Sequence, residues 1–151
     1  MSQRFKYHLS HPGINALREL ETYLHGCGLE HSLLELVKMR ASQINGCAYC
    51  LDMHSKDARA AGETEQRLYT LDGWHETPFF SARERAALEW TESLTRVADT
   101  HVPDEVHARV SKHFTDEELL SLTLAVVAIN GWNRLAISSR VEPGTYKRAG
   151  S

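Results

Sequence analysis

The sequence has few cysteines and no pattern typical of β-strands. Its three cysteines in 151 residues are too few for the disulfide framework of a small secreted domain. No stretch of any length alternates apolar and polar residues as a half-buried strand does, and the sequence shows no internal repeat or low-complexity linker. A chain of this length buries roughly 70% of its unfolded surface on folding. We therefore expect one all-α domain, a helical bundle spanning residues 1–151.

Long apolar runs and a strong charge of one sign are also missing. The first seven residues lack the apolar core of a signal peptide, and we expect no stretch of the about 18 uncharged apolar residues that a membrane span needs. The formal net charge is −3 and the basic residues are scattered, which gives no reason to expect nucleic acid or an anionic membrane as a partner. We expect a cytoplasmic location, where a close pair of cysteines is catalytic, redox-cycling or metal-binding.

Apolar residues recur at spacings of three and four along most of the chain, which predicts helices. Capping boxes at Ser81–Glu84 and Thr115–Glu118 mark two helix starts, and Asn45–Gly46 marks a helix stop. The predicted helices cover residues 13–24, 30–44, 47–61, 63–71, 82–97, 103–110 and 119–129, with a turn at 72–73 and a frayed tail after Pro143. The helix over 119–129 is apolar nearly all round and is expected at the centre of a bundle or at a subunit interface.

The residues that concentrate most chemistry are Cys47 and Cys50, a single C-x-x-C, with His54 four positions later. If Cys47 opens a helix, both sulfurs lie in its first turn, where free amides and the helix dipole favour the thiolate. His54 shares the helix face of Cys50 and lies within reach as base or relay. The absence of strands excludes a thioredoxin fold, and Leu51 after Cys50 excludes haem attachment.

Three interpretations of the pair stay open on these residues. A redox or peroxidatic dithiol is favoured. A zinc site would use Cys47, Cys50 and His54, with Glu35 or another histidine as the fourth ligand. A chance pair of small buried thiols is the third. Cys27, the remaining cysteine, fits a small buried hydrophobic residue better than a third redox thiol.

The stretch around the thiols, about residues 35–54, resembles the core of the AhpD-like alkylhydroperoxidase family, within the carboxymuconolactone decarboxylase superfamily. The resemblance rests on Glu35, on Arg40 to Cys50 (RASQINGCAYC), and on Leu51 to His54 (LDMH). Residues 81–88 and 129–134 also resemble single-domain members, so the similarity spans most of the chain. The decarboxylase branch of the superfamily lacks the C-x-x-C, which argues against that activity.

The resemblance implies an antioxidant, thiol-dependent peroxidase that needs no cofactor and assembles into trimers or hexamers. By position, Cys50 is the peroxidatic thiol, Cys47 the resolving thiol, and Glu35 and His54 the relay. The substrate is an organic hydroperoxide, and an unidentified dithiol or protein reduces the disulfide. Tyr49 stands where the best-known members carry a second histidine, and a tyrosine is a poor proton relay at neutral pH. A non-catalytic redox sensor or binding module is the alternative function.

Overall fold

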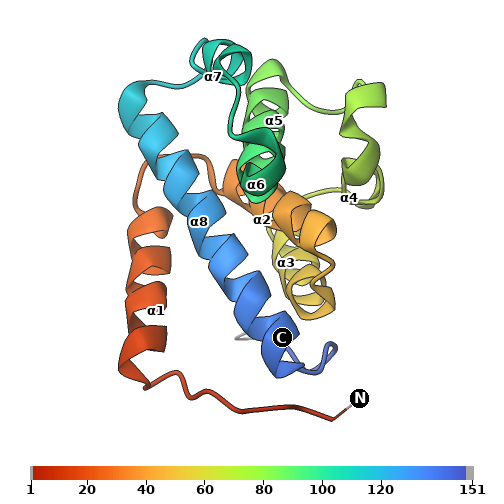
Figure 1. The fold of residues 1–151 in the computed structure, drawn as a ribbon. Helices are drawn as coiled ribbons and strands as arrows, with labels where there is room; N and C mark the ends of the chain where they lie inside the picture. Colours follow the sequence, from red (N-terminus) through yellow and green to blue (C-terminus); the bar gives the residue numbers. More distant parts are fainter. Residues whose placement is uncertain (1, 149–151) are drawn as a thin grey trace.

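Helices α2 and α8 lie at the centre of the molecule, where α3 and α5 each pack against both (Figure 1). Helix α2 spans His31–Asn45 and packs against α3 (Ala48–Ala60), α5 (Ala82–Thr95) and α8 (Asp116–Ser139). The computed structural model describes residues 2–148, and every regular element within them is helical. The predicted all-α fold is confirmed.

Shorter elements cover the flanks of this centre. Helix α1 packs against α8, and α7 packs against α5. The bounds of these elements are α1 Pro12–His25, α4 Glu65–Tyr69, the 3₁₀ helix η1 Leu71–Glu76, α6 Val97–Thr100 and α7 Asp104–Val110. The helix predicted over 63–71 begins later, because the Thr64 side chain caps α4 by accepting from the Arg67 amide. The turn predicted at 72–73 is a 3₁₀ helix, in which Gly73 alone departs from helical dihedrals.

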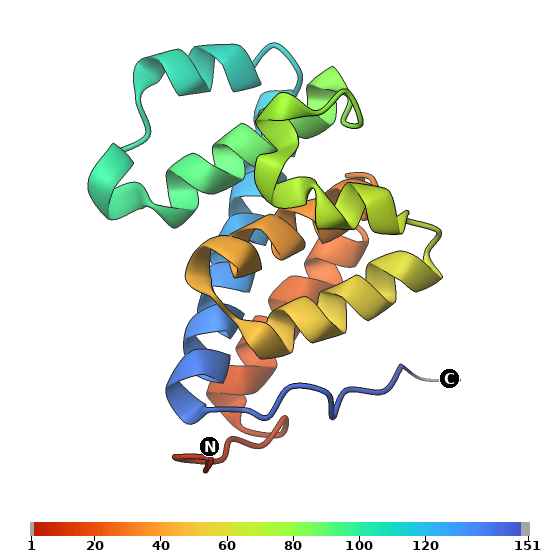
Figure 2. The same cartoon turned by 90° about the vertical axis from the view of Figure 1, so that its right-hand side faces the viewer.

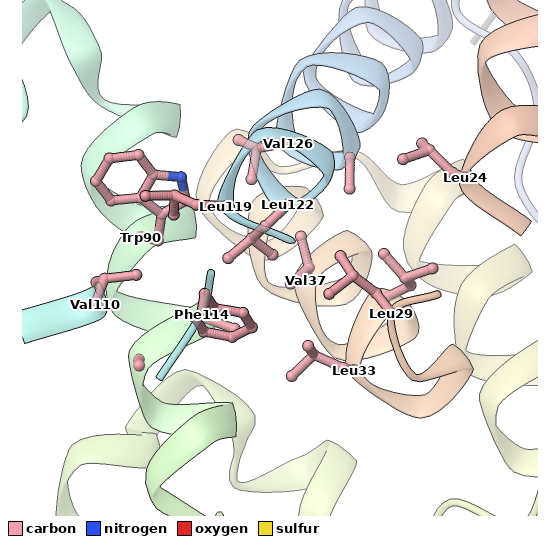
Figure 3. Packing of buried hydrophobic residues seen from close by; sticks show 14 of the residues in the cluster. Leu24, Leu29, Leu33, Val37, Trp90, Val110, Phe114, Leu119, Leu122 and Val126 are labelled. Carbon is pink, nitrogen blue, oxygen red and sulfur yellow. The ribbon is translucent and has the colours of Figure 1, made fainter. Parts of the chain in front are cut away.

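The larger hydrophobic cluster lies between α1, α2, α5 and α8 (Figure 3). Leu33 and Val37 of α2 face Leu122 of α8, and Leu24 contributes from the end of α1. Truncation of a buried leucine of this kind costs about 2–5 kcal/mol. This cluster therefore fixes how α2 is held, and with it the residues of α2 that point to the functional site.

Helix α8 is longer than the apolar pattern predicts, because it continues through a polar stretch to Ser139. Asn133 is fully buried, donates to the Ser42 hydroxyl at 3.0 Å and accepts from the Asn45 amide at 2.9 Å. Asn130 accepts a second hydrogen bond from Asn45 at 3.0 Å. Both asparagines are thus satisfied by contacts between α2 and α8, so polar residues continue the helix inside the core.

Helix α8 contains no run of 18 uncharged apolar residues, but by length and composition it is long and apolar enough to be a candidate membrane span. This helix has 24 residues, its most apolar window has a mean hydropathy of 1.3, and 44% of that window is buried inside the molecule. The central helix of a globular bundle meets the same criterion of length and composition. Because α8 packs on α1, α2, α3 and α5, its composition is weak evidence for a span.

The two chain ends cross the same end of the bundle (Figures 1 and 2). The Arg4 amide donates to the Ser139 carbonyl at 2.9 Å, which ties the N-terminal arm (residues 2–10) to α8. The C-terminal tail (residues 141–148) is anchored on α3, where the Gly144 amide donates to Asp52 at 3.1 Å. The predicted fraying after Pro143 is therefore wrong up to residue 148, and residues 149–151 lie outside the described part of the chain.

Candidate active site

The junction between α2 and α3 sets the position of the two thiols. Gly46 has a φ of 69°, the left-handed conformation that ends α2, and glycine adopts it without a Cβ clash. The Cys47 amide then donates to the Ser42 carbonyl at 3.0 Å, which closes the helix end. Cys47 becomes the N-cap of α3. The helix stop and start predicted from Asn45–Gly46 are confirmed.

Cys47 and Cys50 are joined by a disulfide, with Cα atoms 5.3 Å apart. The Cys47 sulfur also accepts a hydrogen bond from the Cys50 amide at 3.4 Å, the contact of a helix N-cap. Both residues are almost fully buried, with exposed fractions of 1% and 2%. They pack with Ala41, Ile129 and Ala136, so the first turn of α3 sits against α2 and α8.

A cavity of about 800 Å³ opens beside this turn. Cys50 lines the cavity and Cys47 does not, although both lie in the described part of the chain. Glu35 and His54 line it as well, together with Tyr49 and Trp132. The structure therefore brings three of the four predicted site residues to one cavity and places the fourth, Cys47, behind Cys50.

Glu35 and His54 form a buried pair within this cavity. The Nδ1 atom of His54 lies 3.1 Å from a carboxylate oxygen of Glu35, and the two residues are only 4% and 6% exposed. His54 lies four positions after Cys50 on α3, so both side chains emerge on one face of that helix. The bond to Glu35 fixes the orientation of the imidazole beside Cys50.

Two further charged residues extend the pair, and the sequence interpretation missed both. The Lys38 ammonium lies 2.9 Å from Glu21 of α1 and 3.8 Å from the second carboxylate oxygen of Glu35. Lys38 is 5% exposed. Lys38 follows Glu35 by three positions in the helix predicted over 30–44, a spacing that makes the two side chains neighbours and was a usable signal. Nothing in the sequence pointed to Glu21.

The balance of charge around Glu35 decides its ionisation. Burial raises the pKa of this carboxyl, but the hydrogen bond to His54 and the charges of His54 and Lys38 outweigh burial. The pKa of Glu35 is therefore lower than in an exposed glutamate. A carboxyl whose pKa is lower in the folded state adds stability above its unfolded pKa, and this stability is lost as the pH falls through the folded pKa.

Replacing Glu35 with glutamine is expected to flatten the acid side of the stability profile. Between about pH 5 and pH 3, the free energy of unfolding should fall more steeply for the wild type than for Glu35→Gln, because only the wild type binds that proton on unfolding. Urea titrations at several pH values measure both slopes. Glu76→Gln, at an exposed position, is the control and should keep the wild-type slope. Equal slopes for the wild type and Glu35→Gln would contradict the lowered pKa.

The zinc site that the sequence left open is not formed. Within residues 2–148, no group of three or more histidine, cysteine, aspartate or glutamate side chains is placed to hold a metal ion. The sulfurs of Cys47 and Cys50 are bonded to each other, and the Nδ1 atom of His54 faces Glu35. Cys27 is a free, half-buried thiol that packs against the main hydrophobic cluster, as expected for a small hydrophobic residue.

Residues 12–93 match the model of the carboxymuconolactone decarboxylase family. The chain belongs to this family. Its curated relatives include the uncharacterized protein YdfG of Bacillus subtilis (strain 168), which is 44% identical over 139 residues, 91% of this chain and 95% of YdfG. The family assignment made from the C-x-x-C region is confirmed.

Solved structures of other proteins share the fold of this chain. A protein of unknown function from Agrobacterium tumefaciens, named as a candidate antioxidant defence protein AhpD, is 40% identical and has a TM-score of 0.91, over 96% of this chain and 100% of its own. An uncharacterized peroxidase-related protein from Silicibacter sp. TM1040 has a TM-score of 0.75 over 87% of this chain and 70% of its own. At 23% identity, the similarity to the Silicibacter protein concerns the fold alone. The chain is an AhpD-like member of the family.

Proposed function

We propose that this protein is an antioxidant enzyme that reduces organic hydroperoxides through Cys50 and Cys47. The observation that carries the proposal is that Cys50 lines a cavity beside a buried Glu35–His54 pair, with its disulfide partner behind it. A peroxidatic thiol must meet the peroxide, whereas a resolving thiol needs only to reach the oxidised sulfur. This arrangement supports Cys50 as the first thiol and Cys47 as the second. Membership of the AhpD-like family supports the same chemistry.

The proposed cycle has two steps at the cysteines, followed by reduction of the disulfide, and its atoms and electrons balance. The Cys50 thiolate attacks the terminal oxygen of the hydroperoxide, the O–O bond breaks, and the leaving alkoxide takes a proton to become an alcohol. Cys50 is then a sulfenic acid. The Cys47 thiolate attacks its sulfur, a disulfide forms, and the hydroxyl leaves as water after taking a proton. An external dithiol reduces the disulfide, so one hydroperoxide and one dithiol yield one alcohol, one water and one oxidised dithiol.

His54 is proposed to hold and pass the proton in this cycle. Its ring shares a helix face with Cys50, and Glu35 fixes that ring from the other side at 3.1 Å. A histidine placed in this way accepts the Cys50 proton and returns one to the leaving alkoxide. Tyr49 lines the same cavity, but a tyrosine side chain is a poor proton relay at neutral pH. The proposed relay therefore contains one histidine, His54, rather than two.

Replacing His54 with glutamine is expected to slow hydroperoxide reduction by about 10²-fold, the usual contribution of a general acid–base group. The pH at which the Cys50 thiol ionises should also rise, because the thiolate loses its neighbouring proton acceptor. Stopped-flow oxidation of the reduced protein and the ultraviolet absorbance of the thiolate measure the two effects. His113→Gln, at an exposed position between α7 and α8, should change neither. An unaltered rate in His54→Gln would remove His54 from the mechanism.

The test of the proposed function is consumption of cumene hydroperoxide by the reduced protein with dithiothreitol as reductant. We expect sustained turnover, with one alcohol formed for each hydroperoxide lost. A non-catalytic redox sensor would instead form its disulfide once, turn over negligibly, and change its association with a partner on oxidation. Absence of turnover with a reversible disulfide would overturn the peroxidase proposal in favour of the sensor.

Assembly and location belong to the same proposal. We propose a trimer or hexamer in the cytoplasm. The exposed Leu120 and Val127 of α8, with exposed fractions of 55% and 54%, favour an assembly in which another subunit covers part of this helix.

A further inference from the structure

The cavity beside Cys50 is far larger than hydrogen peroxide requires. Its volume of about 800 Å³ lies in the range of pockets that enclose drug-sized ligands, roughly 300–1,000 Å³. Hydrogen peroxide is little larger than a water molecule, which takes up about 30 Å³ in the liquid. A substrate that fills the cavity must therefore carry a bulky group on its peroxide.

Three tyrosines from separate segments line this cavity near Cys50. Tyr7 comes from the N-terminal arm, Tyr49 from the first turn of α3 and Tyr146 from the C-terminal tail. Burial raises the pKa of the Tyr7 phenol, and the neighbouring Tyr49 raises it further. Tyr49 also contributes to the raised pKa of Tyr146, after burial and Asp57. All three tyrosines line the same cavity as Cys50, and we refer to them as the tyrosine wall.

Hydrogen bonds hold both segments that carry the outer two rings: in the N-terminal arm, the Arg4 amide donates to the Ser139 carbonyl at 2.9 Å. The Tyr146 hydroxyl donates to the carboxylate of Asp57 at 2.9 and 3.1 Å, and the Lys56 ammonium donates to the Tyr146 carbonyl at 3.2 Å. Together with the bond from Gly144 to Asp52, these contacts hold the C-terminal tail along α3. Figure 2 shows the tail and the N-terminal arm at the same end of the bundle. A wall held in this way keeps its shape before a ligand arrives.

The charged groups of the cavity are already paired with one another. Lys38 forms ion pairs with Glu21 and Glu35, Glu35 also contacts His54, and Arg148 lies 3.1 Å from Asp57. Arg18 differs, because its guanidinium contacts the Leu9 carbonyl at 3.5 Å, but its side chain is exposed and water screens its charge. The buried part of the cavity thus offers little free charge to hold an ionic group.

We propose that the tyrosine wall makes this cavity a binding site for neutral organic hydroperoxides with a bulky apolar group, in preference to hydrogen peroxide and to hydroperoxides that carry a carboxylate. The aromatic faces of Tyr7, Tyr49 and Tyr146 contact the apolar group while the peroxide reaches Cys50. The proposal rests on the peroxidase function proposed above and names its substrate class.

The experiment compares kcat/KM for cumene hydroperoxide, its para-carboxylate derivative and hydrogen peroxide. Each value is divided by the rate constant of the same peroxide with free cysteine, which removes differences in intrinsic reactivity. We expect the neutral aromatic substrate to exceed the carboxylate and hydrogen peroxide by about 10-fold or more. Equal or higher values for the carboxylate would overturn the proposal and would point to Arg18 as an anion site. If no peroxide is turned over, the proposed function fails rather than its specificity.

Variants of the wall test which residues produce the preference. Tyr7→Ala and Tyr146→Ala should each lower the ratio of cumene hydroperoxide to hydrogen peroxide by about 10-fold, mainly through KM. Tyr146→Phe keeps the ring without the bond to Asp57 and should retain most of the ratio. Tyr69→Ala, 77% exposed on α4, is the matched control and should match the wild type. An unchanged ratio in both Tyr7→Ala and Tyr146→Ala would contradict the role of the wall.

Discussion

Replacing Cys50 with serine is expected to reduce hydroperoxide consumption by about 10³-fold or more, because a serine hydroxyl stays protonated at neutral pH and does not attack the O–O bond. Cys50 lines the cavity and shares a helix face with His54, whereas neither Cys47 nor Cys27 lines it. Peroxide loss with dithiothreitol as reductant measures the effect.

Cys47→Ser should behave differently, because its Cys50 still reacts once with the peroxide. We expect one rapid equivalent of consumption, followed by turnover limited by the external thiol that reaches the sulfenic acid. Cys27→Ser, which changes a half-buried thiol outside the site, should keep wild-type turnover. Equal activity in the wild type, Cys50→Ser and Cys47→Ser would end the dithiol mechanism. A greater loss of the first equivalent in Cys47→Ser than in Cys50→Ser would reverse the two roles.

Replacing Lys38 with methionine is expected to lower the free energy of unfolding by about 3 kcal/mol at neutral pH. The ammonium lies between Glu21 and Glu35, at 2.9 and 3.8 Å, and the side chain is 6% exposed. Removing one partner from a buried ionic group leaves charges without compensation, which costs about 3–5 kcal/mol. The lower end applies here, because Glu21 is 21% exposed and His54 still contacts Glu35. Urea unfolding at pH 7 measures the loss.

Three comparisons separate the charge of Lys38 from its packing. Lys38→Arg keeps the charge and should retain most of the stability. The double variant Lys38→Met/Glu21→Gln should be less destabilised than the sum of its single changes, because both remove the same contact. The loss in Lys38→Met should also shrink as the pH falls below about 4, where carboxylates take up protons. Lys112→Met, at an exposed position, should cost less than about 0.5 kcal/mol. A loss in Lys38→Met that is independent of pH would indicate packing alone.

Local sequence signals predict the features that neighbouring residues determine. Gly46 and Cys47 act within a few residues of each other, so the helix stop, the N-cap and the placement of both thiols in one turn follow from the sequence. The capping boxes at Ser81 and Thr115 are formed as predicted. The pairing of Glu35 with His54 followed from the family resemblance and not from spacing, because the two residues lie on different helices.

Features that depend on distant segments are the ones the sequence did not predict. Glu21 meets Lys38 only because α1 and α2 both pack on α8, and neither helix encodes that approach in its own pattern. The end of α8 was missed because Asn133 looks like a surface residue until Ser42 satisfies it inside the core. The C-terminal tail looked frayed because its partner Asp57 lies far earlier in the chain. In each case a long-range polar contact replaced the apolar periodicity on which the prediction depended.

The identity of the attacking sulfur is tested most directly by trapping its oxidised form. Reduced Cys47→Ser is mixed with one equivalent of cumene hydroperoxide in the presence of dimedone, which reacts with sulfenic acids, and the labelled peptide is identified by mass spectrometry. We predict stoichiometric label on Cys50, together with one equivalent of alcohol, because Cys50 lines the cavity beside the Glu35–His54 pair. Absence of label on Cys50, with label on Cys47 in reduced Cys50→Ser under the same conditions, would contradict the mechanism.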